Sequence, residues 1–494
     1  TLEKTQSYFD ADGERIAPNP NLQLGLADSI IQNYFGKIGF EKEGQRLEIS
    51  ALYYDQTQDT DFIGGVGDIA LGQPVPAIKG GKEPGEVDQG VETSMLNMVY
   101  THSDLVPETV VRAQAYALQF DSVFSYSTFF PEGGQSFVKS DKHGARFDFD
   151  TDLNFLLPTG GRLLYGVDYL KDTSEQPLID GRTFVPEVRQ ENTAFFAQVE
   201  LPVTDRFTVS GGLRYEDFNV DVETFQALFS GATVTGGEIG FSETTHNMGA
   251  SYELVEGLRA FAGFSQGAPV AEIGRVLRSA SEDIDIATFN LAPSITDSYE
   301  IGLRFVKERL QAEVVYYQNE STLGSTTVFD EDTGEFIVAR APEEVQGFEA
   351  SVDYQFTSKL RAGGSFAWIE GDRDTDNNGS TDQPLSGQAV PPEKLALFAE
   401  YDGVADWFLR GQLSYVGNRN EFPESTRFGE GEVNSRVVAD VFAKRAVGSG
   451  ILQLGIHNLF NTDYFTHTSE IMQLPDSYSK APGATLSVEY TIEY

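Results

Sequence analysis

The chain has 494 residues with 35 basic and 76 acidic side chains, a formal net charge of −41, and no cysteine. This acidity argues against nucleic-acid binding, which needs clustered lysine and arginine to neutralise phosphates. The 40% hydrophobic and 12% aromatic fractions are too high for a disordered acidic chain, so the protein folds. The lack of cysteine excludes disulfides, thiolate zinc sites and thiol catalysis.

No apolar stretch reaches the roughly 18 residues of a transmembrane helix. A transmembrane strand needs only about 9–11 residues with every second one apolar, so a membrane barrel stays possible. The first residue is Thr1, and neither a basic segment nor an apolar segment of a signal peptide follows it. We therefore expect that a signal peptide has been removed or that the chain starts inside a longer precursor.

Strict alternation of apolar and polar residues is the main secondary-structure signal. It predicts strands with one apolar, often aromatic face and one face of Arg, Glu, Asp, Gln and Ser. In chain order, the clearest apolar stripes are Leu163/Tyr165/Val167, Phe207/Val209, Leu213/Tyr215, Tyr299/Ile301/Leu303/Phe305, Phe348/Ala350/Val352/Tyr354, Trp407/Leu409, Leu413/Tyr415, Leu452/Leu454/Ile456 and Ala484/Leu486/Val488/Tyr490/Ile492/Tyr494.

The connections between these strands alternate in length. Short turns occur near 202–205, 255–257, 308, 357–358 and 448–450. Long Gly-, Asp-, Thr- and Pro-rich segments occupy 58–91, 124–140, 219–240, 269–295, 322–343, 372–391, 420–433 and 460–479. Within one of them, Phe329 to Phe336 reads as a hairpin. The short–long rhythm predicts antiparallel hairpins with tight turns at one end and large loops at the other.

These patterns predict an all-β fold, a transmembrane antiparallel β-barrel of the 22-stranded transporter type. About 19–20 strands of about ten residues each are present, with aromatic residues at the membrane interfaces. The alternatives are a soluble β-sandwich, β-helix or propeller, in which the apolar face would point inward. The recurrent charged residues on the polar face favour a water-filled or plugged lumen, and no blade repeat is visible.

Two segments resemble the closing strands of TonB-dependent outer-membrane receptors: 453–465, which reads QLGIHNLFNTDYF, and 481–490, which reads APGATLSVEY and precedes a terminal aromatic. Segment 263–278, GFSQGAPVAEIGRVLR, is similar to a further motif of that family. Together with 96–120 and 5–15, it looks most like the hydroxamate, aerobactin-type branch of ferric-siderophore receptors.

The resemblance implies import of a ferric siderophore across a Gram-negative outer membrane by a monomer that interacts with the TonB–ExbB–ExbD complex, the surrounding lipid and lipopolysaccharide, and the barrel-assembly machinery. Other cargo (cobalamin, haem or an oligosaccharide) and a passive porin or adhesin barrel remain alternatives. Family members begin with a TonB box and a plug domain, and nothing in this sequence matches either. We therefore expect residues 1–494 to be the barrel domain, with residues 1–10 at the end of about the third strand.

A candidate ligand site lies in the long-loop segments. The aromatic residues Tyr126, Phe129 and Phe130 could pack the organic shell of a metal chelate, while Arg275 and Arg278 could pair with its carboxylates. Alternatively, the aromatic residues pack the loops against one another and the arginines neutralise neighbouring acids.

A candidate calcium site lies in the loop 374–382. Asp374, Asp376, Asn378 and Asp382 fit the first part of an EF-hand-like loop, with Gly379 at the sharp turn. The glutamate required at the twelfth position is Leu385, so a complete EF-hand is excluded. The alternative is a solvated acidic loop. We expect no catalytic residues, because the five histidines are scattered, and no required cofactor.

Overall fold

A computed structural model describes residues 2–18, 27–81, 85–268, 273–288, 294–324, 326–330, 335–339, 341–374, 378–422 and 429–492. Their main feature is one antiparallel sheet of 21 strands, of which β1 (Leu2–Lys4) and β23 (Gln383–Pro384) are very short. The long strands, each paired with its neighbour in chain order, are β2 (Ser29–Lys42), β3 (Gln45–Gln58), β6 (Gly90–Val106), β7 (Thr109–Ser127), β8 (Gly134–Asp152), β9 (Arg162–Pro177), β10 (Thr183–Thr204), β11 (Phe207–Val222), β14 (Gly237–Val255), β15 (Leu258–Gly267), β17 (Thr296–Lys307), β18 (Leu310–Ser321), β21 (Glu343–Gln355), β22 (Leu360–Arg373), β24 (Lys394–Val404), β25 (Trp407–Val416), β26 (Arg436–Val447), β27 (Gly450–His457) and β28 (Thr485–Ile492).

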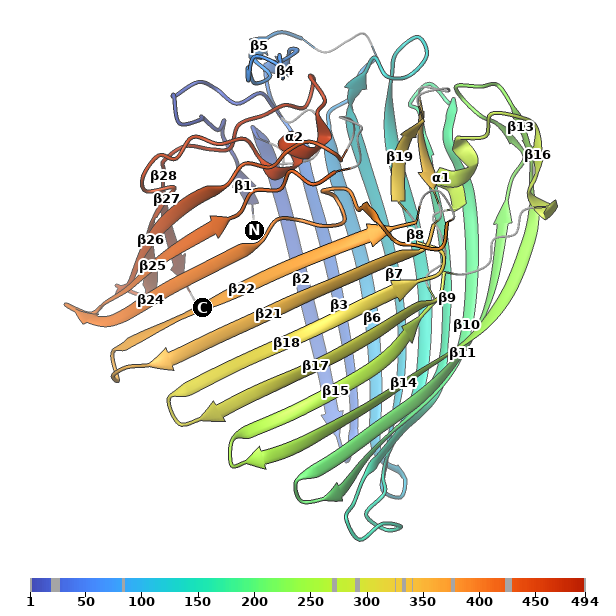
Figure 1. Cartoon of the computed structure of the whole chain (residues 1–494), viewed down its shortest axis with the longest axis vertical. Helices are drawn as coiled ribbons and strands as arrows, with labels where there is room; N and C mark the ends of the chain where they lie inside the picture. Colours follow the sequence, from blue (N-terminus) through green and yellow to red (C-terminus); the bar gives the residue numbers. More distant parts are fainter. Residues whose placement is uncertain are drawn as a thin grey trace.

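The remaining elements lie in the long connections. They are the strands β4 (Phe62–Gly64), β5 (Ala77–Lys79), β12 (Phe225–Gln226), β13 (Thr233–Thr235), β16 (Ile284–Asp285), β19 (Thr326–Asp330) and β20 (Glu335–Ala339), the helices α1 (Ile273–Arg278) and α2 (His467–Met472), and a 3-10 turn at Ile286–Thr288. Figure 1 shows that these elements gather at one end of the sheet, while tight turns join the strands at the other end. No helix among the described residues is long and apolar enough to cross a membrane.

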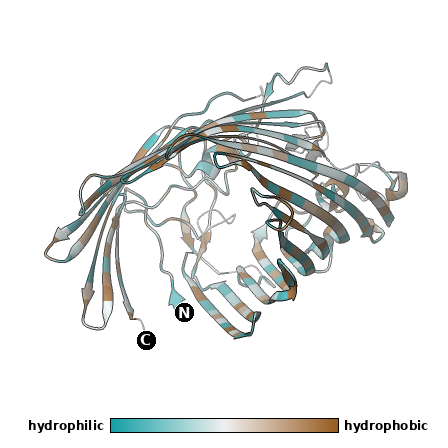
Figure 2. Ribbon diagram, turned by 90° about the horizontal axis from the view of Figure 1, so that it is seen from below, coloured by the Kyte–Doolittle hydropathy of each residue, from teal (hydrophilic) through white to brown (hydrophobic). Residues whose placement is uncertain are grey.

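The sheet curls around a central space, and hydrophobic and hydrophilic residues alternate along its strands (Figure 2). The predicted apolar stripes lie on the outer face, where Leu486 is 71% exposed and Ile301 61% exposed. A soluble sandwich would bury these side chains, so their exposure, together with the curled sheet, confirms the predicted barrel architecture.

The pairing of the strands agrees with the predicted series of antiparallel hairpins. The short strand β1 pairs with the first long strand, Leu2 opposite Gln32, at the long-loop end. The predicted hairpin is also present, with Phe329 opposite Phe336. At the other edge of the sheet, β28 pairs with β27 alone among the described residues.

The predicted loop bounds were wrong on one side of the barrel. Segment 124–140 was expected to be a loop, but β7 runs to Ser127 and β8 begins at Gly134. The expected loop 219–240 is likewise shortened by β11 and β14. Strands reach 19 residues in β7, β8 and β14 and 22 in β10, where about ten were expected. The added length extends the sheet beyond the span that a membrane requires and supports the loops.

Glycine and aromatic residues face each other across the inner wall. In each case the two are direct register partners, and a Cβ on the glycine would lie 2.3–3.1 Å from the aromatic ring, so the ring occupies the space that a side chain would need. The pairs are Tyr116 with Gly144, Phe261 with Gly302, Tyr317 with Gly347, Phe398 with Gly363, and Phe442 with Gly455. The rings thereby bury apolar area against the wall and stay out of the central space.

Candidate functional site

The loop end of the barrel contains an aromatic cluster, which we call the crown cluster: Phe129, Phe130, Phe184 and Phe229. The ring of Phe130 lies 5.0 Å from that of Phe184, and the ring of Phe129 lies 4.9 Å from that of Phe229. Three separate connections therefore meet at one place, because the β7–β8 turn, the start of β10 and the β11–β14 connection each contribute rings.

Two of the predicted ligand residues differ sharply in exposure. Phe130 is 6% exposed and belongs to a buried core with Leu178 and Phe184, whereas Phe129 is 42% exposed. Phe130 therefore packs the loops together, as in the alternative interpretation, whereas part of the Phe129 ring stays accessible from outside. Tyr126 is 36% exposed and lies near the end of β7, with its hydroxyl beside the left-handed Gly133.

The helix α1 brings the predicted arginines to the same region. Ile273 and Leu277 are buried in a core with strands β10 and β11, and this anchors one face of the helix. Arg278 extends to the crown cluster, where its guanidinium lies 4.4 Å from the centre of the Phe184 ring. The structure thus brings Arg278 to the same site as Phe129 and Phe130, which lie far from it in sequence. Arg275 occupies the last turn of the same helix.

Phe184, Phe229 and Arg182 were missed by the sequence reasoning. Phe229 lay in a segment predicted as a loop. Arg182 lies in the short connection before β10 and Phe184 lies at the start of β10, and no local signal in the sequence marked either residue. Arg182 donates to the carbonyl of Gly133 at 2.6 Å and also to that of Pro131, so it fastens the β7–β8 turn to the neighbouring hairpin.

The predicted calcium loop is organised by its own backbone. Asp374 is 3% exposed and accepts the N–H of Asn378 at 3.2 Å and that of Gly379 at 2.9 Å. Gly379 has φ of +86°, as expected at a sharp turn. Asn378 accepts the N–H of Ser380, and Asp382 accepts from the side chain of Gln383.

Asp376 lies outside the described residues. Within the described part of the chain, no group of three or more His, Cys, Asp or Glu side chains is placed to hold a metal ion. Calcium binding to this loop therefore stays a prediction.

A further contact, which we call the seam contact, joins residues 9–12 to residues 461–483 at the loop end. The side chain of Asn461 donates to the carbonyl of Ala11 at 2.8 Å, and Lys480 lies 2.8 Å from carboxylate oxygens of both Asp12 and Asp463. Burial alone would lower the pKa of Lys480, but its bonds to the two carboxylates raise the pKa above the ordinary lysine value. The ammonium therefore stays charged and holds the N-terminal segment against the β27–β28 connection.

A buried polar network fixes the helix α2 beside this contact. Glu470 accepts from the backbone and side chain of Asn434, at 3.2 and 3.0 Å, and from Arg436 at 3.2 Å. Burial raises the pKa of Glu470, although these donors oppose the shift. His467 lies with Nε2 3.1 Å from the carbonyl of Gly387, and burial lowers its pKa.

Charged side chains on the inner wall form ion pairs both within a strand and between strands. On one side, Arg214 lies 2.6 Å from Asp168, and Arg146 bridges Asp168 at 3.6 Å and Asp148 at 3.2 Å. Arg112 extends the ladder to β7 at 3.3 Å from Asp148. In this part of the wall the charged side chains therefore compensate one another.

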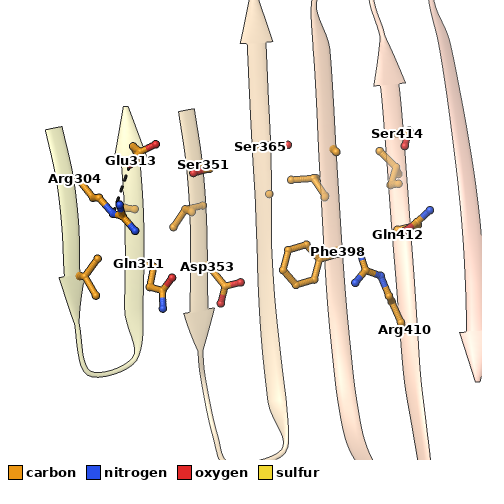
Figure 3. A pocket seen from close by; sticks show the side chains of 17 residues that line it. Arg304, Gln311, Glu313, Ser351, Asp353, Ser365, Phe398, Arg410, Gln412 and Ser414 are labelled. Carbon is orange, nitrogen blue, oxygen red and sulfur yellow. Dashed lines mark ion pairs between the residues drawn. The ribbon is translucent and has the colours of Figure 1, made fainter. Parts of the chain in front are cut away.

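A second ladder lies between β21 and β25. Glu400 accepts from Arg361 at 3.0 Å and from Arg410 at 2.8 Å, and Arg361 also pairs with Asp353. Both guanidinium groups lie about 5 Å from the ring of Phe398. Asp353, Phe398 and Arg410 of this ladder also line a hollow of about 490 Å³. The other side chains of the hollow that Figure 3 labels are Arg304, Gln311, Glu313, Ser351, Ser365, Gln412 and Ser414. Such a wall offers hydrogen-bonding groups to water or to protein segments inside the barrel.

Comparison with known proteins agrees with this geometry. Residues 33–459 match the model of the family described as "TonB dependent receptor-like, beta-barrel". The chain is 24% identical to the rhizobactin receptor of Rhizobium meliloti (strain 1021), over 94% of this chain and 66% of that protein. It is 22% identical to the ferric aerobactin receptor of Klebsiella pneumoniae, over 99% of this chain and 71% of that protein.

Solved structures share the fold. The copper transporter OprC superposes with a TM-score of 0.78 at 16% identity, over all of this chain and 75% of that one. This chain thus spans about two thirds to three quarters of the length of these proteins.

Proposed function

Because the chain belongs to the family of TonB-dependent receptors, we propose that it is the barrel of a receptor that imports a ferric siderophore into the periplasm. Barrels of this family lie in the outer membrane of Gram-negative bacteria, and the exposed apolar outer face suits that location. The family consists of transport receptors that work with TonB.

One observation carries the choice of cargo. Both curated relatives named above are siderophore receptors by name, and the match to them runs through the loop end as well as the wall strands. The crown cluster supports this choice, since exposed Phe129 offers an apolar surface beside the cationic Arg278, and a ferric chelate with carboxylates needs both. Copper, the cargo named for OprC, is less favoured, because soft ligands are scarce: the chain has no Cys, 4 Met and 5 His.

The remaining assignments belong to the same proposal. Residues 1–494 would form the barrel domain of the receptor, and the plug expected from the resemblance would contact TonB, itself energised by ExbB and ExbD. The barrel would function as a monomer, assembled by the barrel-assembly machinery and surrounded by lipid and lipopolysaccharide. In the extracellular loop 374–382, calcium would serve a structural role.

Uptake by living cells tests the proposal. A strain lacking its own siderophore receptors, complemented with the full-length gene, is grown under iron limitation with purified siderophores supplied one at a time. We expect hydroxamate chelates of the aerobactin type to restore growth. If no siderophore restores growth but a different cargo does, the cargo assignment is wrong.

A further inference from the structure

An apolar trough interrupts the outer face of the barrel between β11 and β21. It has a volume of about 510 Å³, and among its lining residues are Phe207, Ala250, Tyr252, Ala260, Ala262, Ile301, Leu303, Val314, Tyr316 and Phe348. Nearly all of the lining is apolar, in contrast to the hollows on the inner wall.

Small side chains in register form the floor of this trough. Ala250 of β14 is the direct partner of Ala262 of β15, and Ala260 lies two residues along the same face. Large side chains stand on both sides, with Tyr252 opposite Ala260 on β14 and Leu303 opposite it on β17. A run of alanines between taller residues therefore leaves an elongated depression, which is continuous with the exposed lipid-facing surface.

The position of the trough relative to the tight turns indicates which leaflet of the membrane it faces. Its lining begins at Phe207 and Tyr252, directly beside the tight turns that join β10 to β11 and β14 to β15. In outer-membrane barrels the short turns face the periplasm. The trough therefore lies in the periplasmic leaflet, which contains glycerophospholipids.

A cation lies outside the lining of the trough, beyond its end nearest the turn. Lys307 follows Leu303 on the same face of β17, about 13 Å further along the strand. It is exposed, and within the described part of the chain it forms no ion pair. A phosphate at the membrane interface could bind there while its acyl chain extends toward Ala262.

We propose that this trough is a binding site for one glycerophospholipid of the periplasmic leaflet, with an acyl chain over the alanine floor and the phosphate at Lys307. An apolar depression without polar partners does not hold ordered water, so hydrocarbon is the occupant that its chemistry fits. An acyl chain also follows an elongated trough of this kind, and packing against Ala250 and Ala262 gives it contacts that a flat lipid-facing wall lacks.

The test uses the full-length receptor in a mild detergent, titrated with a synthetic phosphatidylethanolamine and observed by native mass spectrometry. The double variant Ala250→Leu/Ala262→Leu fills the floor while keeping the surface apolar. The matched control is Ala362→Leu/Ala399→Leu, which changes another pair of directly opposed alanines on the outer face of β22 and β24. Heat-dependent electrophoretic mobility verifies that each barrel is folded, and the single variant Ala262→Leu replaces the double one if that does not fold.

We expect wild type and the control to bind one lipid with equal affinity, and the filled variant to bind it about tenfold more weakly. Lys307→Gln should lower the affinity for the lipid several-fold. Equal lipid binding by the filled variant and the control would overturn the proposal. A change in the number of receptor copies without a change in lipid binding would also overturn it, because the trough would then be a contact between barrels.

Discussion

Asn461 donates a hydrogen bond from its side-chain amide to the carbonyl of Ala11, 2.8 Å away and 450 residues earlier in the chain. Its Oδ1 also accepts the N–H of Ala484 at 2.9 Å, and its backbone is left-handed, with φ of +54°. Asn461→Ala removes both bonds and places a side chain that disfavours this backbone, at a cost of about 1–2 kcal/mol for the conformation alone. We expect faster hydrogen exchange in the segments around Ala11 and Ala484.

Asn461→Gly separates the two effects. Glycine accepts the left-handed backbone, so this variant loses only the side-chain bonds, each contributing about 1 kcal/mol. We expect its exchange to lie between that of wild type and that of Asn461→Ala. Wild-type exchange in the glycine variant would show that the hydrogen bonds do not stabilise the seam contact.

Gly347 leaves space on the inner wall for the ring of its partner Tyr317. A Cβ at Gly347 would lie 2.3 Å from ring atoms of Tyr317, so Gly347→Ala forces the ring away from the wall. We expect a loss of about 1–3 kcal/mol, measured as a lower urea midpoint of the barrel in micelles. Gly411→Ala is the control, because nothing lies within 4 Å of a Cβ there.

The same pair permits a double-mutant cycle. Once Tyr317→Ala has removed the ring, adding Gly347→Ala should cost little, because the clash no longer exists. Additive losses from the two substitutions would contradict the proposed contact.

Arg278 offers a test of the ligand site that differs from a test of packing. Arg278→Ala should weaken binding of a carboxylate-bearing ferric siderophore by about 10- to 150-fold, as expected for one charge-assisted hydrogen bond of about 1.5–3 kcal/mol. Arg278→Lys should retain part of that affinity, because it keeps the charge but not the planar guanidinium that stacks on Phe184. Affinity is measured by titration of the purified full-length receptor.

Phe129 and Phe130 are the controls for this prediction. Phe130→Ala empties a buried position and should destabilise the loops by about 3–5 kcal/mol, seen as faster proteolysis. Phe129 is partly exposed, so Phe129→Leu should destabilise the loops much less than Phe130→Ala does, and it should weaken ligand binding. Arg278 is a packing residue if Arg278→Ala accelerates proteolysis as much as Phe130→Ala does and weakens siderophore binding no more than Phe130→Ala does.

Sequence alone predicted the wall but only part of the site. Period-two alternation is a local signal, so the apolar stripes, such as Leu486, Val488, Tyr490 and Ile492 in β28, could be read directly. The hairpin that pairs Phe329 with Phe336 was equally local. The bond between Lys480 and Asp12 joins residues 468 apart, and no local pattern marks either partner. Phe184 likewise gained its place in the crown cluster only through tertiary packing.

His467 makes the fold around α2 sensitive to acid. Burial lowers its pKa, the hydrogen bond to Gly387 opposes this, and the charge of Arg436 adds to it. A histidine with a lowered folded-state pKa contributes stability above its unfolded pKa of about 6.5 and loses it as the pH falls. We expect the amides of 467–472 to exchange faster, after correction for intrinsic rates, at pH about 5.5 than at pH about 7.5.

His467→Gln is the control for this prediction, because glutamine does not titrate. Glu470 acts in the opposite direction, since its raised pKa makes the folded state favour the protonated acid as the pH falls. The variant should therefore lose the acid-induced opening or reverse it. An acid response equal to that of wild type would show that another group controls this region.

Asp374 distinguishes a calcium site from a turn stabilised by hydrogen bonds alone. The carboxylate accepts the N–H of Asn378 with one oxygen and that of Gly379 with the other, whereas an asparagine side chain has one acceptor oxygen. Asp374→Asn should therefore lower stability by about 1 kcal/mol in the presence of a chelator.

If the loop binds calcium, wild type should gain thermal stability when calcium is added, and the variant should gain much less because it has lost a charged ligand. Ser380→Ala keeps both backbone bonds and should respond as wild type does. If the thermal unfolding midpoint of wild type is the same with calcium and with chelator, no ion stabilises the loop. Asp374 then serves only to stabilise the turn.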